Sequence, residues 1–177
     1  MSLWDGLVSN IPDRSIFLRV VQMKFVIIYD SVSKARVTEK VAVLIQDGLK
    51  EKGIEAEALH VSHSASIKIE DFDCLIIGSP TMAWKPTKET VKFLEGLKGK
   101  NLAGKCAASF DTQMKSFASG NANKAMESQL KELGFKVIGV PLQAYVKDGM
   151  KNPQLLDGES EKAKEWAKGL VDAAEAK

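Results

Sequence analysis

The sequence predicts an α/β protein with a doubly wound, five-stranded parallel sheet in the order 2-1-3-4-5 and helices on both faces. Two observations support this prediction. Apolar runs of strand length alternate along the chain with stretches in which apolar residues recur at helical spacing. Polar loops also follow the strand runs directly and lead into helices, which is the pattern of parallel βαβ units.

Length and composition indicate one globular domain. The chain has 177 residues, of which 45% are apolar and 27% charged, so it is long enough for a substantial core. The formal net charge of +2 is too small to favour nucleic acid or an anionic membrane as a partner. Cys74 and Cys106 each lie inside an apolar run, so we expect reduced core thiols and a cytoplasmic location.

Residues 1–22 do not fit the alternating pattern. Their apolar stretches are too short to cross a bilayer and lack the order of a signal peptide. Met23 directly precedes the first strand run. We therefore expect an N-terminal extension over residues 1–22 and the α/β domain over residues 23–177.

The first strand, loop and helix predict an anion site. The apolar run Phe25 to Tyr29 is followed by small hydroxyl residues, and helical spacing begins at Thr38. Such a loop lies at the carboxyl end of a strand and the amino end of a helix, where free backbone N–H groups and the helix dipole favour an anion. The loop has no glycine, the residue that usually allows a phosphate to approach the backbone closely.

The second informative loop follows a buried strand. A second strand is expected over residues 54–60, near the sheet edge, and the next apolar run, 71–77, leads into the loop 78–86. Pro80 and Pro86 stiffen this loop, so the segment between them should project with Trp84 exposed. An exposed indole on a rigid loop suits a planar ligand, but packing on its own loop or on a neighbouring subunit is equally open. A helix should follow from Pro86 to Gly99.

The remaining chain completes the alternation. Residues 105–110 predict a strand that ends in the polar loop 111–120, and a helix should follow over residues 121–133. Residues 135–140 predict the fifth strand. Residues 141–158 predict a long irregular connection, and the last helix should place Trp166 in the core. His60 and His63 are three apart without a cluster of further ligands, so no metal site is predicted.

Three polar loops should meet at one place. In the order 2-1-3-4-5, the connections from strands 1 and 3 leave toward opposite faces, and a crevice opens between them. The loops after the first, third and fourth strands should converge on this crevice. This argument identifies a place for a ligand and leaves its chemistry open.

Four short motifs resemble the flavodoxin-like family, and the resemblance covers nearly the whole chain from Met23 onward. They read Ile-Ile-Tyr-Asp-Ser, Thr-Glu-Lys-Val-Ala, Gly-Ser-Pro-Thr with a following aromatic and proline, and Ser-Phe-Asp-Thr. The resemblance implies flavin mononucleotide (FMN) as the cofactor. It implies a phosphate loop and two segments flanking the isoalloxazine ring, with these cofactor-binding residues: Ser31, Ser33, Lys34, Ala35, Arg36, Val37 and Thr38; Pro80, Thr81, Met82, Ala83 and Trp84; Asp111, Thr112, Gln113 and Phe117.

The phosphate loop departs from the family pattern. Aligning the pattern on Thr38 places Ala35 where a hydroxyl residue is usual and Arg36 where glycine is usual. We therefore expect a residue with a β-carbon to adopt a positive φ. Arg36 and Lys34 offer positive charge to a phosphate, whereas the alternative is that these side chains fill the pocket and no flavin is held.

The resemblance implies an electron-transfer protein without a catalytic side chain, because the flavin itself carries the redox chemistry. Its partner would be a redox protein or a small-molecule electron acceptor, and a homodimer is left open. Two alternatives remain. One is an FMN-dependent NAD(P)H:quinone-type reductase, in which residues 141–158 and Tyr145 would help to wall a second substrate site. The other is a binding module that has lost its flavin.

Overall fold

The computed structural model describes residues 23–116, 120–147 and 152–176 of the chain. The expected N-terminal extension, residues 1–22, lies outside these ranges, as does Phe117. No helix in the described ranges is both long and apolar enough to traverse a lipid bilayer.

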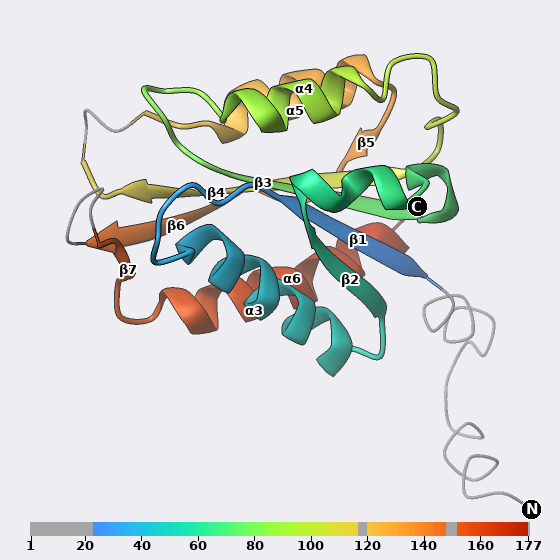
Figure 1. Cartoon of the computed structure of the whole chain (residues 1–177). Helices are drawn as coiled ribbons and strands as arrows, with labels where there is room; N and C mark the ends of the chain where they lie inside the picture. The colour runs from blue at the N-terminus through green and yellow to red at the C-terminus, as the bar shows by residue number, and fades with distance from the viewer. Residues whose placement is uncertain (1–22, 117–119, 148–151, 177) are drawn as a thin grey trace, which may run out of the picture.

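One mixed sheet forms the centre of the molecule (Figure 1). Its strands are β1 (Lys24–Tyr29), β2 (Glu55–His60), β3 (Cys74–Pro80), β4 (Cys106–Met114), β5 (Lys136–Val137), β6 (Leu142–Lys147) and β7 (Gln154–Leu155). The order is β2-β1-β3-β4-β6-β7, and β5 pairs separately with β4. Among the named strands of the described residues, only β6 and β7 pair in antiparallel fashion. The predicted α/β class and the neighbours of the first four strands are therefore confirmed.

Helices cover both faces of the sheet. Helices α3 (Val37–Glu51) and α6 (Glu159–Glu175) lie on one face, and α4 (Lys88–Glu95) and α5 (Asn123–Glu132) on the other (Figure 1). Two short 3₁₀ helices, η1 (Val61–Ser66) and η2 (Ile69–Asp71), lead from β2 to β3. Helix α4 begins at Lys88 rather than at the expected Pro86, and Thr87 caps it, because the Thr87 side-chain oxygen accepts a hydrogen bond from Thr90 N.

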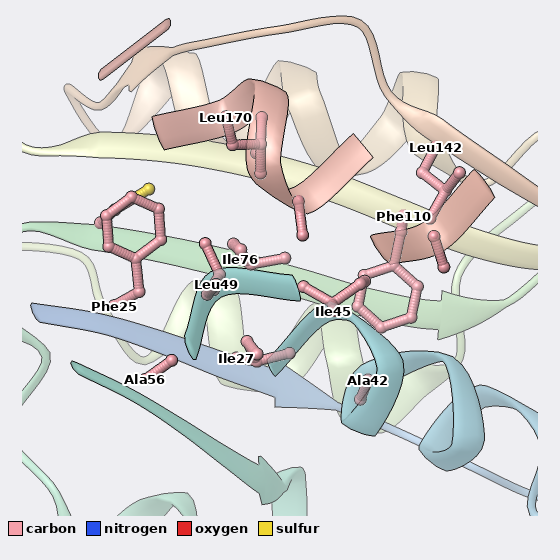
Figure 2. Packing of buried hydrophobic residues seen from close by; sticks show 14 of the residues in the cluster. Phe25, Ile27, Ala42, Ile45, Leu49, Ala56, Ile76, Phe110, Leu142 and Leu170 are labelled. Carbon is pink, nitrogen blue, oxygen red and sulfur yellow. The ribbon is translucent and has the colours of Figure 1, made fainter. Parts of the chain in front are cut away.

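Burial on both faces explains the continuous apolar runs. Phe25 and Ile27 of β1 belong to the core under α3 and α6, whereas Val26 and Ile28 belong to the core under α4 and α5. Figure 2 shows the first of these cores, where side chains of the sheet meet those of α3 and α6. It also contains Cys74, which faces Cys106 across the β3–β4 pair, and both cysteines are buried as expected.

The prediction for the fifth strand and its connection was wrong. Only Lys136–Val137 form β5, because Gly139 has a φ of 68° and breaks the extended run. The strand that continues the sheet is β6, inside the segment expected to be irregular. Its alternate residues Leu142, Ala144 and Val146 face the protein, but the prolines and glycines around them concealed this alternation.

Two smaller expectations also need correction. Strand β4 continues to Met114, so Asp111, Thr112 and Gln113 lie in a strand rather than in a loop. Trp166 is only half-buried at the edge of the core, and its indole N–H donates a hydrogen bond to Val140 O at 2.6 Å. A buried indole needs such a partner, which a carbonyl at the surface provides here.

Close contact between α3 and α6 predicts opposite effects for two glycine-to-alanine changes. A Cβ at Gly48 would lie 2.6 Å from Lys164 O on α6, whereas a Cβ at Gly169 meets nothing within 4 Å. We expect Gly48→Ala to lower the free energy of unfolding by about 1–3 kcal/mol through overpacking. Gly169→Ala should raise it by up to about 1 kcal/mol, because alanine favours the helix. Denaturant unfolding measures both, and a destabilising Gly169→Ala would contradict the packing described here.

Candidate functional site

A pocket of about 510 Å³ opens at the carboxyl edge of the sheet. The loops after β1 and β3 and the ends of β4 and β6 all reach this edge, on the left of Figure 1. Its volume is in the usual range for a cofactor or small-molecule site. Its lining residues are Val32, Ser33, Val37, Thr38, Pro80, Thr81, Met82, Ala83, Thr112, Gln113, Met114, Val146 and Pro153.

The structure brings together most of the sequence-predicted site residues. Those that line the pocket are Ser33, Val37, Thr38, Pro80, Thr81, Met82, Ala83, Thr112 and Gln113. Those that flank it without lining it are Ser31, Lys34, Ala35, Arg36, Trp84 and Asp111. Lys34 and Arg36 are exposed, so their side chains do not fill the pocket.

Sequence reasoning missed four lining residues, Val32, Met114, Val146 and Pro153. Val32 lies between two hydroxyl residues and Met114 beside polar ones, so local composition concealed both apolar side chains. Val146 and Pro153 belong to the segment expected to be irregular. Tyr145 of the same segment is not part of the pocket lining, and its hydroxyl instead donates a hydrogen bond to Gln143 Oε1 at 2.9 Å.

Arg36 adopts the backbone conformation that glycine usually supplies. Its φ of 51° and ψ of 43° are left-handed, as the sequence predicted for a β-carbon-bearing residue. Arg36 N donates to Ser33 O at 3.0 Å, which closes a tight turn directly before α3. The turn therefore forms without glycine, at the cost of some backbone strain.

The start of α3 offers unpaired donors to the pocket. The helical hydrogen bonds begin with Lys40 N, which donates to Arg36 O at 3.1 Å, so the amides of Val37 and Thr38 have no intrahelical partner. Among the residues that the structure describes, no side chain caps this end of the helix, and the buried Ser31 Oγ has no hydrogen-bond partner. Thr38 Oγ1 lies 2.8 Å from Thr112 Oγ1, which fixes a further hydroxyl here. These groups fit an anion.

Charged groups surround this turn. Arg36 forms an ion pair with Glu39 one turn into α3. The pKa of Tyr29 is raised above its usual value, mainly by burial and then by the Glu39 carboxylate, although Arg36 opposes the shift. Next to Tyr29, the nearly buried Asp30 carboxylate accepts from Ser31 N at 2.8 Å and contacts His60 Nε2 at 3.1 Å. Because His60 Nδ1 accepts a hydrogen bond from Ser62 N, a neutral His60 carries its proton on Nε2. This N–H then donates a hydrogen bond to the Asp30 carboxylate.

The loop after β3 ends in a tight hairpin turn. Met82 and Lys85 exchange backbone hydrogen bonds, and the two residues between them, Ala83 and Trp84, have φ values of 47° and 74°. Positive φ at both central positions is the requirement of a type I′ turn, which glycine and asparagine usually meet. The Trp84 side chain is 59% exposed, as predicted.

Asp111 fastens this loop to the sheet and to α5. Its fully buried carboxylate accepts hydrogen bonds from Thr81 Oγ1 at 2.8 Å, Ala122 N at 3.1 Å and Gln113 Nε2 at 3.1 Å. Burial raises the pKa of Asp111 to about 6, although the hydrogen bonds from Thr81, Ala122, Gln113 and Asn123 act to lower it. Asp111 is therefore a positioning residue behind the pocket rather than part of its wall.

Comparison with known proteins identifies the family of this chain. The family model described as Flavodoxin matches residues 27–169. The chain belongs to the flavodoxin family. Its cofactor is FMN, and flavodoxins transfer electrons to redox partners. A flavodoxin from Clostridium saccharobutylicum is 33% identical over 91 residues, which are 51% of this chain and 56% of that protein. The match thus spans little more than half of that relative.

The solved structures that share the fold include a flavodoxin matched over nearly its full length and a second protein matched over about a third of its length. Oxidised flavodoxin 1 from Bacillus cereus superposes with a TM-score of 0.70 at 25% identity, covering 84% of this chain and 97% of that one. Rubredoxin oxygen:oxidoreductase from Desulfovibrio gigas superposes with a TM-score of 0.69 at 23% identity, covering 86% of this chain and 36% of that one. At that identity the second match shows the fold alone.

Proposed function

We propose that this flavodoxin is an FMN-dependent electron carrier that holds the cofactor in the pocket at the carboxyl edge of the sheet. The observation that carries the proposal is the uncapped start of α3 beside the unpartnered Ser31 hydroxyl, in a pocket to which the loops after β1 and β3 and the ends of β4 and β6 contribute. When bound, FMN takes up and releases one or two electrons, while the protein sets its potential through packing, hydrogen bonds and charge.

The phosphate group belongs at the α3 end of the pocket. The backbone amides of Val37 and Thr38 and the hydroxyls of Ser31, Ser33 and Thr38 would hold it, in the sequence-predicted loop Ser31–Thr38. Lys34 and Arg36 add positive charge at the exposed side of the loop, although Arg36 is already paired with Glu39.

The ring belongs at the other end of the pocket. Pro80, Met82 and Ala83 would form one side of its site with Trp84 beside them, and Gln113 would form the other. Thr112 would lie between the ring and the phosphate, because its hydroxyl is 2.8 Å from that of Thr38. Asp111 acts behind this wall, because it holds Thr81 in position. These side chains bind and orient the ring and limit the access of water to it.

Exposed side chains beside the proposed flavin-ring site favour an electron carrier over a reductase or a flavin-free binding module. Met82, Trp84 and Met114 remain exposed around the pocket mouth, which suits contact with a redox protein. The loss of flavin would be supported by side chains that fill the pocket, but Lys34 and Arg36 are exposed and do not line it.

Rapid mixing distinguishes a carrier from a reductase. The FMN-loaded protein is mixed anaerobically with NADH, with NADPH or with dithionite, and the flavin absorbance is followed. We expect dithionite to reduce the flavin promptly, whereas either nicotinamide should act at least about 100-fold more slowly, because a carrier has no site that orients a hydride donor. Bleaching by NADH or NADPH as fast as by dithionite would contradict the proposal and support the reductase.

A further inference from the structure

Four exposed apolar side chains gather around the mouth of the pocket. Val32, Met82, Trp84 and Met114 are 58%, 38%, 59% and 45% exposed. Three of them line the pocket, and Trp84 follows the lining residue Ala83. Val43 and Val140 are the other large apolar side chains exposed in the described ranges, and neither lines the pocket. The mouth is therefore the main apolar surface described, and such surfaces mark interaction sites.

Three described lysines lie beside this apolar surface. Lys85, Lys115 and Lys147 are exposed beside it, at the ends of the β3 loop, β4 and β6, and we call these three residues the basic rim. Lys115 Nζ lies 5.8 Å from the centre of the Tyr145 ring, a cation–π contact that holds it near β6.

Carboxylates do not balance the basic rim. Among the described residues that line the pocket or adjoin a lining residue in the chain, the only carboxyl groups are Glu39 and Asp111. Glu39 is paired with Arg36, and Asp111 is fully buried. The chain as a whole carries a formal net charge of only +2, so the rim is a local concentration of positive charge.

A bound cofactor would leave the basic rim uncompensated. The two negative charges of a phosphate would lie at the α3 end of the pocket, near Lys34 and Arg36. The basic rim lies instead on the β3, β4 and β6 segments, next to the apolar mouth. Electrostatic attraction by the basic rim would steer a negatively charged partner toward the exposed edge of the flavin ring.

We propose that the redox partner is a protein with an acidic docking face, in which carboxylates surround a small apolar centre. This inference rests on the proposed function, because it takes the pocket mouth as the site of electron transfer. The apolar mouth provides the desolvated contact, and the basic rim selects the charge of the partner and sets its orientation.

Two small oxidants of opposite charge test the field at the mouth. The FMN-loaded, reduced protein is mixed with ferricyanide or with hexaammineruthenium(III) in a stopped-flow instrument between about 10 and 300 mM salt. The rate with ferricyanide should fall at least about threefold as salt increases, and the rate with the cationic oxidant should rise. The triple variant Lys85→Glu, Lys115→Glu and Lys147→Glu should reverse both trends.

A matched control has the same change in charge at the opposite end of the sheet. Lys98→Glu, Lys131→Glu and Lys136→Glu alter exposed lysines after α4, in α5 and in β5. This variant should keep both salt trends of the parent protein. Trends that do not depend on the sign of the oxidant, or that change equally in both triple variants, would overturn the inference.

A second readout does not require flavin. Poly-L-glutamate is titrated into the ¹⁵N-labelled protein at low salt, and amide shifts are mapped by NMR. The largest shifts should cluster at the basic rim and at Met82, Trp84 and Met114, and the rim triple variant should lose them. Shifts that map elsewhere, or tighter binding of duplex DNA or anionic vesicles than of poly-L-glutamate, would overturn an acidic protein partner. Failure to bind FMN would instead overturn the proposed function, and this titration would still show whether the mouth binds an acidic polymer.

Discussion

Asp111→Asn is expected to remove a pH dependence of stability that the wild-type protein shows between about pH 4 and pH 7. The pKa of Asp111 is about 6 in the folded protein and 3.8 for an ordinary aspartate. Because folding raises this pKa, the carboxyl group contributes most to stability below pH 3.8, and that contribution is lost as the pH rises through 6. The difference of about two between these two pKa values corresponds to about 3 kcal/mol in the free energy of unfolding.

Unfolding measured at several pH values isolates this contribution. The stability of the wild-type protein relative to Asp111→Asn should fall by about 3 kcal/mol between pH 4 and pH 7. Asp71→Asn, which removes an exposed carboxyl group, is the matched control. The carboxyl ¹³C shift of Asp111 should titrate with a midpoint near pH 6. A midpoint near 4, with a constant stability difference, would contradict the buried position of this carboxylate.

Thr38→Val should weaken FMN binding by about 10- to 100-fold while changing riboflavin binding by less than about twofold. Thr38 is nearly fully buried at the start of α3 and lines the pocket, and its hydroxyl lies 2.8 Å from Thr112 Oγ1. A hydrogen bond to a charged group contributes about 1.5–3 kcal/mol, and riboflavin lacks the phosphate that would accept it. Flavin fluorescence titration gives both dissociation constants.

Thr112→Val is the matched control for this change. It also removes the contact between the two threonine hydroxyls, but it leaves the Thr38 hydroxyl in place. It should therefore affect FMN and riboflavin alike. An equal loss of both ligands in Thr38→Val, or an FMN-specific loss in Thr112→Val, would show that the phosphate does not lie where we propose.

The sequence predicted the parts of the site that depend on local pattern. The apolar runs of β1 and β3 end abruptly in polar loops, so their carboxyl ends and the α3 start were identifiable. Alignment on the family pattern placed Arg36 where glycine is usual, and Arg36 adopts the positive φ expected there. The fold class followed from the same alternation of strands and helices.

The sequence could not predict features that depend on distant contacts. Asp111 is polar and was therefore assigned to a loop, yet it lies in a buried strand because Thr81 and Ala122 supply its hydrogen bonds from other segments. The pairing of β6 with β4 likewise depends on where Gly139 ends the short strand β5. Such long-range contacts leave no periodic signal in the chain.

A titration of the purified, flavin-free protein with FMN and with riboflavin tests most directly whether the pocket binds FMN through its phosphate. We expect FMN to bind with one-to-one stoichiometry and with quenched flavin fluorescence. Riboflavin should bind at least about 100-fold more weakly, because it offers no anion to the start of α3. Equal affinities for the two flavins, or no quenching by FMN, would contradict it.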